Sequence, residues 1–503
     1  MNTTPAHYLE CKTLSDLKQI GYIELTVKEE LRRNLINALK IGENPFKGIH
    51  GYDDTVLPDL QKAILSRHNI LLLGLRGQAK TRIARLLTEL LDEHIPIIRG
   101  SEINDSPFHP ISKYGKDKLA EQGDDVDIEW VHRSTRYAEK LATPDVTVAD
   151  LIGDVDPIKA ATLKLPYSDE RVIHFGLIPR SHRSIFVINE LPDLQARIQV
   201  SLFNILQEED VQIRGFKLSL PLDILFVFTA NPEDYTNRGS IVTPLKDRID
   251  SQILTHYPKD IETSKHITLQ EARLTPEQRE TVISHPLIDT LIEQVAFEAR
   301  KSEYIDAKSG VSARLTIAAR ELLFSNAERR MLINNEPNAY INFSDFYGVM
   351  PAITGKVELV YEGEQEGPAK VAAIVIGKAI KSLFLEYFPD PEKEKKSDSE
   401  KSTYRTITDW FAKQKSLDLL VNAPYNSYKQ ALDSISGLRE LVTKLHPGLS
   451  EPEQYLFMEF CLHGMAEFSL LGKFRLERGI EFKDMMSYLF SFSKSPEDYE
   501  EEE

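Results

Sequence analysis

The sequence predicts an α/β fold in which a parallel sheet lies between helices, with helical regions after it. Short apolar runs such as "NILLLGL", "SIFVIN" and "DILFVFTAN" alternate with amphipathic stretches such as "LQARIQVSLFNILQEED". Strands that are buried on both faces of a parallel sheet show continuous apolar runs of this kind. From residue 261 onward helical periodicity dominates, as in "HPLIDTLIEQVAFEARK" and "SARLTIAARELLFSNAERRM". The order of elements therefore indicates an α/β domain that is followed by helices.

Composition limits the classes of function. The chain has 503 residues, which suits about two to four domains. Its net charge of −17 argues against general electrostatic binding to nucleic acids or anionic membranes. The two cysteines, Cys11 and Cys461, provide neither a disulfide framework nor zinc-ligand spacing, which fits a reducing compartment. With no signal-like N-terminus and no run of ~18 apolar residues, we expect a cytoplasmic protein without membrane insertion.

Shifts in composition divide the chain into expected segments. "PDPEKEKKSDSEKS" is typical of a charged linker, "SPEDYEEEE" of an acidic tail, and "VQIRGFKLSLP" of a hairpin around Gly215. "HIPIIRG" is expected to be a further strand of the alternation. The segments are an N-terminal helical segment at 1–41, the α/β core at 42–258, a helical lid with a small hairpin at "GKVELVYEGEQEG" within 259–388, the linker at 389–403, a C-terminal helical domain at 404–494 and the tail at 495–503.

A Gly-rich turn between a strand and a helix, "LLLGLRGQAKTRIARLL", carries the strongest functional signal. The P-loop pattern G-x-x-x-x-G-K-[ST] fits Gly74, Gly77, Lys80 and Thr81 but departs at Ala79. Such a loop still holds phosphates if residue 79 keeps a negative φ, with Lys80 supplying positive charge and the Thr81 hydroxyl ligating Mg²⁺. The alternative is a Gly-containing turn with a chance Lys-Thr pair. The predicted nucleotide contacts are Gly74, Leu75, Arg76, Gly77, Gln78, Ala79, Lys80, Thr81 and Arg82.

The strand "SIFVINELPDL" carries the second half of the predicted site. In P-loop ATPases such a Walker B strand usually ends in Asp-Glu, but here Asn189 precedes Glu190. Glu190 is the candidate that polarises the attacking water. An amide oxygen at Asn189 can still accept a hydrogen bond from a magnesium-bound water, but it carries no negative charge. We therefore expect weaker Mg²⁺ affinity and slower turnover, and an Asn189→Asp change should alter both.

Three polar residues further along could complete the site. Asn231 ends the strand of "DILFVFTANPEDY", where a sensor would contact the γ-phosphate and water; the alternative is a capping Asn before Pro232. Arg248 in "PLKDRID" could reach a neighbouring subunit's nucleotide as an arginine finger, or pair with an adjacent aspartate. Arg314 in "SARLTIAARE" could reach the γ-phosphate from the lid, or lie in solvent.

With these motifs in order, residues 42–330 resemble the AAA+ ATPases of the helix-2-insert group, most closely the MoxR type and the magnesium-chelatase ATPase subunit. "GQAKT" is similar to the MoxR-type Walker A, "TPDVTVADLIGDVDP" to the start of the helix-2 insert, and "GIHGYDD", with Tyr52, to the loop that contacts adenine. The resemblance implies a P-loop sheet with an α-helical lid, ATP and Mg²⁺ as cofactors, and a ring, usually a hexamer, with ATP between subunits. It also implies a partner with a von Willebrand factor A-type domain. Residues 104–141 are long for that family and are expected to be an insertion.

Several functions remain open from sequence alone. The first is a Mg²⁺-dependent motor that remodels a partner or drives metal insertion. The second is a nucleotide-gated assembly protein with slow or absent hydrolysis, because of Asn189. A third, a sigma-factor activator, normally displays a GAFTGA loop between the Walker motifs, which this sequence lacks.

Overall fold

The computed structural model describes residues 4–167, 169–208, 210–211, 213, 220–232, 240–397, 403–413, 415–476 and 478–485. The chain divides into two compact units between Tyr257 and Pro258, one residue from the expected end of the α/β core. Among the described residues, no helix combines the length and the apolar character that a membrane span requires.

The first unit is built on a five-stranded parallel sheet. Its order is β11–β1–β10–β7–β4, so that strands far apart in the sequence are neighbours. The strands are β1 (Ile70–Leu73), β4 (Tyr137–Leu141), β7 (Ser184–Asn189), β10 (Ile224–Ala230) and β11 (Ser251–Leu254). Every residue of β1, β7 and β10 is buried, which explains their continuous apolar runs. The predicted parallel sheet is therefore confirmed.

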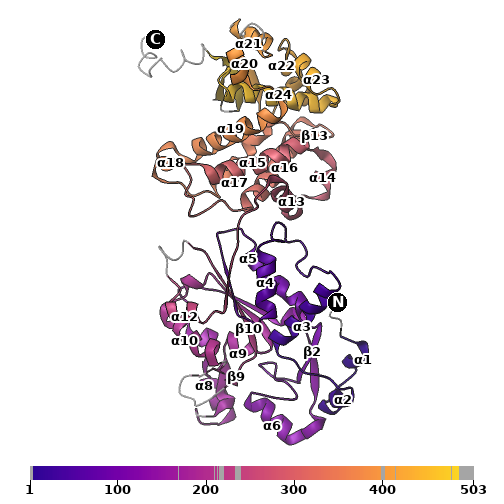
Figure 1. Ribbon diagram of the computed structural model, residues 1–503, viewed down its shortest axis with the longest axis vertical. Coiled ribbons are helices and arrows are strands. Elements are labelled where there is room, and N and C mark those ends of the chain that lie inside the picture. The colour runs from indigo at the N-terminus through magenta and orange to yellow at the C-terminus, as the bar shows by residue number, and fades with distance from the viewer. Residues whose placement is uncertain are drawn as a thin grey trace. The chain divides into compact units, whose positions relative to one another are not determined.

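Helices cover both faces of this sheet (Figure 1). Successive strand residues point to opposite faces, so Leu72 and Val187 pack on one side and Leu71 and Phe186 on the other. The first side is covered by α3 (Val27–Lys40), α4 (Val56–Leu65) and α5 (Lys80–Leu86). The second is covered by α9 (Leu177–Arg180), α10 (Ala196–Glu208) and α12 (Thr243–Asp247). The two apolar layers hold the strands in one register.

The predicted place of two strands is wrong. "HIPIIRG" does form a strand, β2 (His94–Ile98), but it pairs antiparallel with β3 (Ile128–His132) outside the main sheet. The last residues of the expected 104–141 insertion form β4, the edge strand of the main sheet. β4 has the sequence "YAEKL", and its residues are half-buried or exposed, so it lacks an apolar run. An edge strand can carry such polar residues because one side is unpaired.

The insertion between β2 and β4 packs with the N-terminal residues. It contains α6 (Lys113–Gln122) and β3, and its backbone meets the N-terminal segment at the Thr13–Asp127 bridge. The N-terminal segment forms α1 (Ala6–Leu9), α2 (Leu14–Gln19) and α3. Because α3 packs on the sheet, this expected helical segment belongs to the first unit.

Two antiparallel strand pairs lie at segments that the sequence singles out, and one of them was predicted as a hairpin. The segment expected to open the helix-2 insert forms α7 (Val148–Leu151) and β5 (Gly153–Val155), which leads through α8 (Pro157–Leu163) to the antiparallel partner β6 (Ile173–Phe175). The hairpin predicted around Gly215 has paired flanks, β8 (Asp210–Val211) and β9 (Leu220–Pro221). Gly215 itself lies outside the described residues.

The second unit is mainly helical. Its described helices are α13 (Ile261–Glu271), α14 (Pro276–Thr281), α15 (Pro286–Lys301), α16 (Arg314–Asn334), α17 (Met350–Thr354), α18 (Tyr361–Glu366), α19 (Pro368–Tyr387), α20 (Pro391–Ser397), α21 (Arg405–Ala412), α22 (Tyr425–Asp433), α23 (Leu438–Leu445) and α24 (Glu451–Glu467). Two short strands, β12 (Val282–Ile283) and β13 (Ala339–Tyr340), pair in parallel. The two strongest helix predictions, which correspond to α15 and α16, are confirmed.

Three expectations for this unit are corrected. The hairpin predicted at "GKVELVYEGEQEG" is not formed. Residues 361–366 of this segment form the helix α18, and its one backbone bridge joins Leu359 to Ile305. Part of the expected linker forms α20. The region expected to be only helical holds an antiparallel sheet of β14 (Leu417–Leu420), β16 (Gly479–Asp484) and β15 (Leu471–Leu476). The sequences of β14 (LDLL) and β15 (LGKFRL) do not alternate strictly between apolar and polar residues, so they lack the strand pattern. The acidic tail lies outside the described residues.

The helices between residues 261 and 387 and the C-terminal helices share one core. α19 and α24 pack together, and one apolar cluster extends from Val282 to Phe482. The carboxylate of Glu459 in α24 is fully buried, and it accepts hydrogen bonds from Phe343 N and Ser344 Oγ, both at 2.8 Å. These contacts tie residues on either side of the expected linker into one unit rather than two domains.

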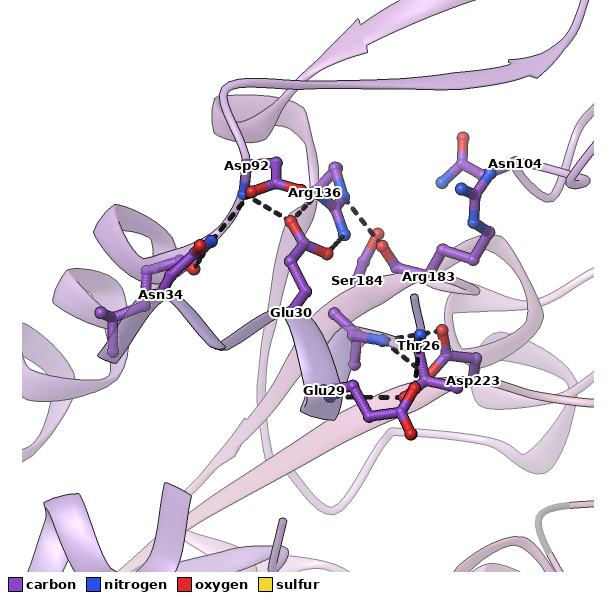
Figure 2. A network of polar contacts seen from close by, with 12 residues as sticks. Thr26, Glu29, Glu30, Asn34, Asp92, Asn104, Arg136, Arg183, Ser184 and Asp223 are labelled. Atoms are coloured by element: carbon purple, nitrogen blue, oxygen red, sulfur yellow. Dashed lines mark hydrogen bonds and ion pairs between the residues drawn. The ribbon is translucent and has the colours of Figure 1, made fainter. Parts of the chain in front are cut away.

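A network of buried charges lies at the amino ends of the parallel strands (Figure 2). Arg136, Arg183 and Asp223 directly precede β4, β7 and β10. The two terminal nitrogens of Arg136 donate to the two carboxylate oxygens of Glu30 in α3, both at 2.7 Å, and Arg136 Nε donates to Arg183 O at 2.9 Å. Asp223 accepts from Val27 N at the start of α3, and burial raises the pKa of its carboxyl to about 6. The network anchors α3 to the sheet.

We expect Arg136→Met to lower the free energy of unfolding of the first unit by about 3–5 kcal/mol, because it leaves the Glu30 carboxylate buried without its cation. Both side chains are at most 3% exposed. The double variant Glu30→Leu/Arg136→Met should recover most of this loss. Urea denaturation checks both, with Lys18→Met as the control, since the Lys18–Asp124 pair is half exposed and contributes at most about 1 kcal/mol. A double variant no more stable than Arg136→Met would contradict this account.

Candidate active site

The polar residues that follow β1, β7 and β10 meet at one edge of the sheet. Parallel strands all end at the same edge, which is why this edge gathers them. Lys80 Nζ donates to Asn231 Oδ1 at 2.6 Å, and Asn231 Nδ2 donates to Glu190 Oε2 at 2.8 Å. Lys80 and Asn231 are buried, and Glu190 is half-buried. The structure thus joins three of the four residues predicted to be catalytic.

The loop before α5 folds back over its own lysine. Lys80 Nζ also donates to the carbonyl oxygens of Gly74 and, at 3.0 Å, of Leu75. A side chain at Gly74 would collide with Thr255 Oγ1 and Gln78 Oε1, at 2.0 and 2.2 Å from its Cβ. A side chain at residue 74 would therefore displace the Thr255–Gln78 hydrogen bond.

The backbone of this loop departs from the sequence expectation at Ala79. From sequence, phosphate binding at this loop was conditional on a negative φ at residue 79. That condition is not met, because φ is 58°, in the left-handed region, and Gly77 has a φ of 74°. An alanine in this region costs roughly 1–2 kcal/mol because its Cβ approaches the following carbonyl oxygen. The strain allows the chain to turn from the loop into α5 at Lys80.

Three residues outside the motif donate hydrogen bonds to the phosphate loop. Tyr52 Oη donates to Gln78 O at 3.0 Å and to His256 O at 2.7 Å, and burial raises the pKa of Tyr52. Thr255 Oγ1 donates to Gln78 Oε1 at 2.7 Å, and Tyr257 Oη donates to Arg76 O at 2.9 Å. Tyr52 was predicted to lie at the adenine; its contact with a base stays a prediction. Thr255 and Tyr257 were missed, because they follow β11 without any motif.

The Asn189 amide is held in one orientation. Its Nδ2 donates to Glu139 Oε1 at 2.6 Å, and its Oδ1 accepts from Thr229 Oγ1 at 3.1 Å. A carboxylate can only accept, so the amide nitrogen must face Glu139. Thr229 Oγ1 in turn accepts from Glu190 N at 3.2 Å. Glu139 lies in β4, and sequence analysis missed it because that strand carries no apolar signal.

Glu190 also adopts an uncommon backbone conformation. Its φ is 55°, again in the left-handed region, directly after β7 ends at Asn189. Such conformations cost about 1–3 kcal/mol and persist where the surroundings impose them. Here Glu190 N is held by Thr229 and its carboxylate by Asn231.

Neither predicted arginine can be joined to this hydrogen-bond chain: Arg248 bonds to other residues of the first unit, and Arg314 belongs to the second unit. Arg248 follows α12, where Nε donates to Gln207 Oε1 at 3.0 Å, Nη1 donates to Pro244 O at 2.8 Å, and the guanidinium lies over the Phe203 ring. Arg314 is exposed at the start of α16 in the second unit. Their roles toward a nucleotide stay predictions.

The oxygen donors at this edge suit Mg²⁺ and a phosphate chain. Thr81 follows Lys80 directly, and Asn189 and Glu190 supply amide and carboxylate oxygens, the donors that Mg²⁺ prefers. The Lys80 ammonium supplies positive charge to phosphate oxygens. The residues present therefore fit ATP with Mg²⁺. Direct contacts of Gly74, Gln78 and Arg82 with a nucleotide stay predictions.

Known structures resemble this chain only distantly. No family model matches the chain. Similar solved structures include the complex between subunits BchI and BchD of magnesium chelatase (19% identity, 64% of this chain, 98% of the other, TM-score 0.33). They also include NtrX from Brucella abortus in complex with ADP (10% identity, 68% of this chain, 64% of the other, TM-score 0.34). A third is a mutant of RuvB from Thermotoga maritima (12% identity, 93% of this chain, 95% of the other, TM-score 0.33). At these scores the assignment of a P-loop α/β fold rests on the strand order and phosphate loop of this chain.

We expect Ala79→Gly, which restores the strict P-loop pattern, to keep or raise the free energy of unfolding by up to about 1 kcal/mol. The change relieves the strain at φ 58°, and this gain offsets the greater entropy that glycine has in the unfolded chain. The matched control is Ala84→Gly within α5, which should cost about 1 kcal/mol. Chemical denaturation of both variants checks this; equal losses would show that Ala79 is unstrained.

Proposed function

We propose that this protein is a Mg²⁺-dependent ATPase of the AAA+ type, similar to the MoxR and magnesium-chelatase motors, that remodels a partner protein or drives metal insertion. The observation that carries the proposal is the hydrogen-bond chain from Lys80 through Asn231 to Glu190. It places a cation, an amide and a carboxylate at the edge of a parallel sheet where a P-loop lies. That set is what phosphoryl transfer to water requires.

The residues take separate roles in this proposal. MgATP, when bound, supplies the γ-phosphoryl group and the divalent charge that offsets the negative charge of its oxygens. Lys80 would hold the β- and γ-phosphate oxygens, and Thr81 would offer its hydroxyl to the cation. Glu190 would orient the attacking water and accept its proton. Asn231, already bonded to both Lys80 and Glu190, would keep the two at a fixed separation.

A ring assembly belongs to the same proposal. Arg248 would reach the nucleotide of a neighbouring subunit, and Arg314 would reach the nucleotide of its own. The position of Arg248 after α12 supports this, because its guanidinium lies at the surface between α10 and α12. A hexamer, and a partner with a von Willebrand factor A-type domain, are the assembly that the sequence resemblance implies.

Asn189 favours a second candidate, a nucleotide-gated assembly protein that hydrolyses ATP slowly or not at all. The residue stands where P-loop ATPases usually carry Asp, and its amide is neutral. In this alternative, ATP binding would drive ring formation, and turnover would be incidental.

Glu190→Gln separates the two candidates. We expect steady-state ATP hydrolysis to fall at least about 100-fold, because the amide cannot accept the proton of the attacking water. ATP binding should persist, whereas Lys80→Ala should abolish it. Glu208→Gln, an exposed site at the end of α10, is the control. Background turnover of the wild-type protein with tight ATP binding would instead support the assembly protein.

A subunit-mixing experiment tests Arg248. We expect Arg248→Ala alone to lose about 10³-fold or more in turnover, as the loss of an arginine finger does. Mixing it with Glu190→Gln should restore part of the activity, because some interfaces then combine an intact Glu190 with a neighbour's Arg248. Lys246→Ala, in the helix that Arg248 directly follows, is the control. A mixture that stays inactive would place the role of Arg248 within its own subunit.

A further inference from the structure

The residue that stands in place of the usual Walker B aspartate has a carboxylate beside it. Glu139 Oε1 lies 2.6 Å from Asn189 Nδ2, although the two residues are 50 positions apart in sequence. They come from adjacent parallel strands, β4 and β7, and Ala142 N donates to Asn189 O at 2.8 Å where β4 ends. Asn189 is only 7% exposed, and the Glu139 side chain is 23% exposed. A negative charge therefore lies one hydrogen bond away from position 189, where the Walker B pattern has an aspartate.

The partners of Glu139 divide between its two oxygens. Oε2 accepts from Arg85 Nε at 3.1 Å, from Arg85 Nη2 at 3.0 Å and from Tyr137 Oη at 2.9 Å. Oε1 accepts from Asn189. The Arg85 side chain is 64% exposed, so water screens its positive charge. Arg85 therefore compensates the negative charge of the Glu139 carboxylate only in part. Tyr137, on the same strand, holds Oε2 independently of Arg85, and Oε1 remains for the amide.

This arrangement determines what Asn189 presents to the site. With Nδ2 bonded to a carboxylate, the amide is polarised and its negative end, Oδ1, is turned away from Glu139. Oδ1 accepts one hydrogen bond, from Thr229, and a carbonyl oxygen has a second lone pair for another donor. Asn189 and Glu139 together thus form an acceptor with a nearby negative charge, which is what an aspartate would supply alone.

We infer that Glu139 is the positioning residue that supplies the charge missing at Asn189, and that the two residues act as a split Walker B acid toward the hydrated magnesium ion of the nucleotide. This inference rests on the proposed function, because it concerns the cation that accompanies ATP. Groups that orient and charge the acceptors around a metal typically change its affinity 10- to 100-fold when they are removed. Glu139 should therefore affect Mg²⁺ more than it affects the nucleotide itself.

The inference changes the expected effect of Asn189→Asp. Sequence alone suggested that an aspartate would repair the motif. In the structure it would place two carboxylates within hydrogen-bond distance, with no donor between them, so they would repel each other. Asn189→Asp alone should therefore lower the melting temperature measured without nucleotide. The charge-transposed double variant Glu139→Gln/Asn189→Asp should not, because the Gln amide then donates to the new carboxylate.

The test is a Mg²⁺ titration of the binding of a fluorescent ATP analogue to the full chain. We expect Glu139→Gln to raise the half-saturating Mg²⁺ concentration about tenfold or more, with little change in nucleotide affinity in EDTA. The double variant should return to within about threefold of wild type. Arg85→Met is the matched control: it removes the ion pair but keeps the Glu139–Asn189 bond, so it should not weaken the response to Mg²⁺.

Three results would overturn the inference, and they can be distinguished. An unchanged Mg²⁺ response in a folded Glu139→Gln protein would show that Glu139 has no role toward the cation. An equal weakening in Arg85→Met would show that the ion pair only supports α5. If wild type binds no ATP analogue at all, the proposed function itself fails, and the inference fails with it.

Discussion

The hydrogen bond from Lys80 Nζ to Asn231 Oδ1 depends on the register between two parallel strands. Leu73 pairs with Ala230, and Gly74 N donates to Ala230 O at 3.1 Å, so β1 and β10 end at the same level. The loop then returns its lysine to the end of β10. A shift of one residue would move Asn231 by about 3.3 Å and turn its side chain to the other face. The apolar layers on both faces of the sheet prevent that shift, and so the core determines the geometry of the site.

Strain is concentrated at the same edge. Ala79 and Glu190 both have φ near 55–58°, a conformation that disfavours side chains with a Cβ. Each is imposed by contacts around it: the loop is tied by Tyr52 and Thr255, and Glu190 by Thr229 and Asn231. The opposite edge, where Arg136 and its partners lie, is a closed network of buried charges. The sheet thus has buried, paired charges at its amino edge and strained, polar residues at its carboxyl edge.

The sequence predicts the parts of this fold that are buried and leaves out those that are not. β1, β7 and β10 are buried along their whole length, so each is visible as an apolar run, and the motifs at their ends predict Lys80, Glu190 and Asn231. β4 is half exposed at the sheet edge and lacks such a run, so Glu139 was not found. Its contact with Asn189 depends on which strands are neighbours, which periodicity does not contain. The positive φ of Ala79 was likewise set by tertiary contacts rather than by local preference.

The split acid bears on the choice between a motor and a slow assembly protein. A neutral Asn189, considered by itself, favours slow hydrolysis. In the structure that amide is bonded to Glu139, and the hydrogen bonds continue through Thr229 to the backbone of Glu190. The negative charge that the Walker B pattern would place at position 189 is therefore present on Glu139 of the neighbouring strand β4. Three hydrogen bonds link Glu139 to Glu190, the proposed base. A neutral residue at position 189 then gives no reason to expect an inactive site, and the remaining difference between the two functions lies in the turnover that Glu190 supports.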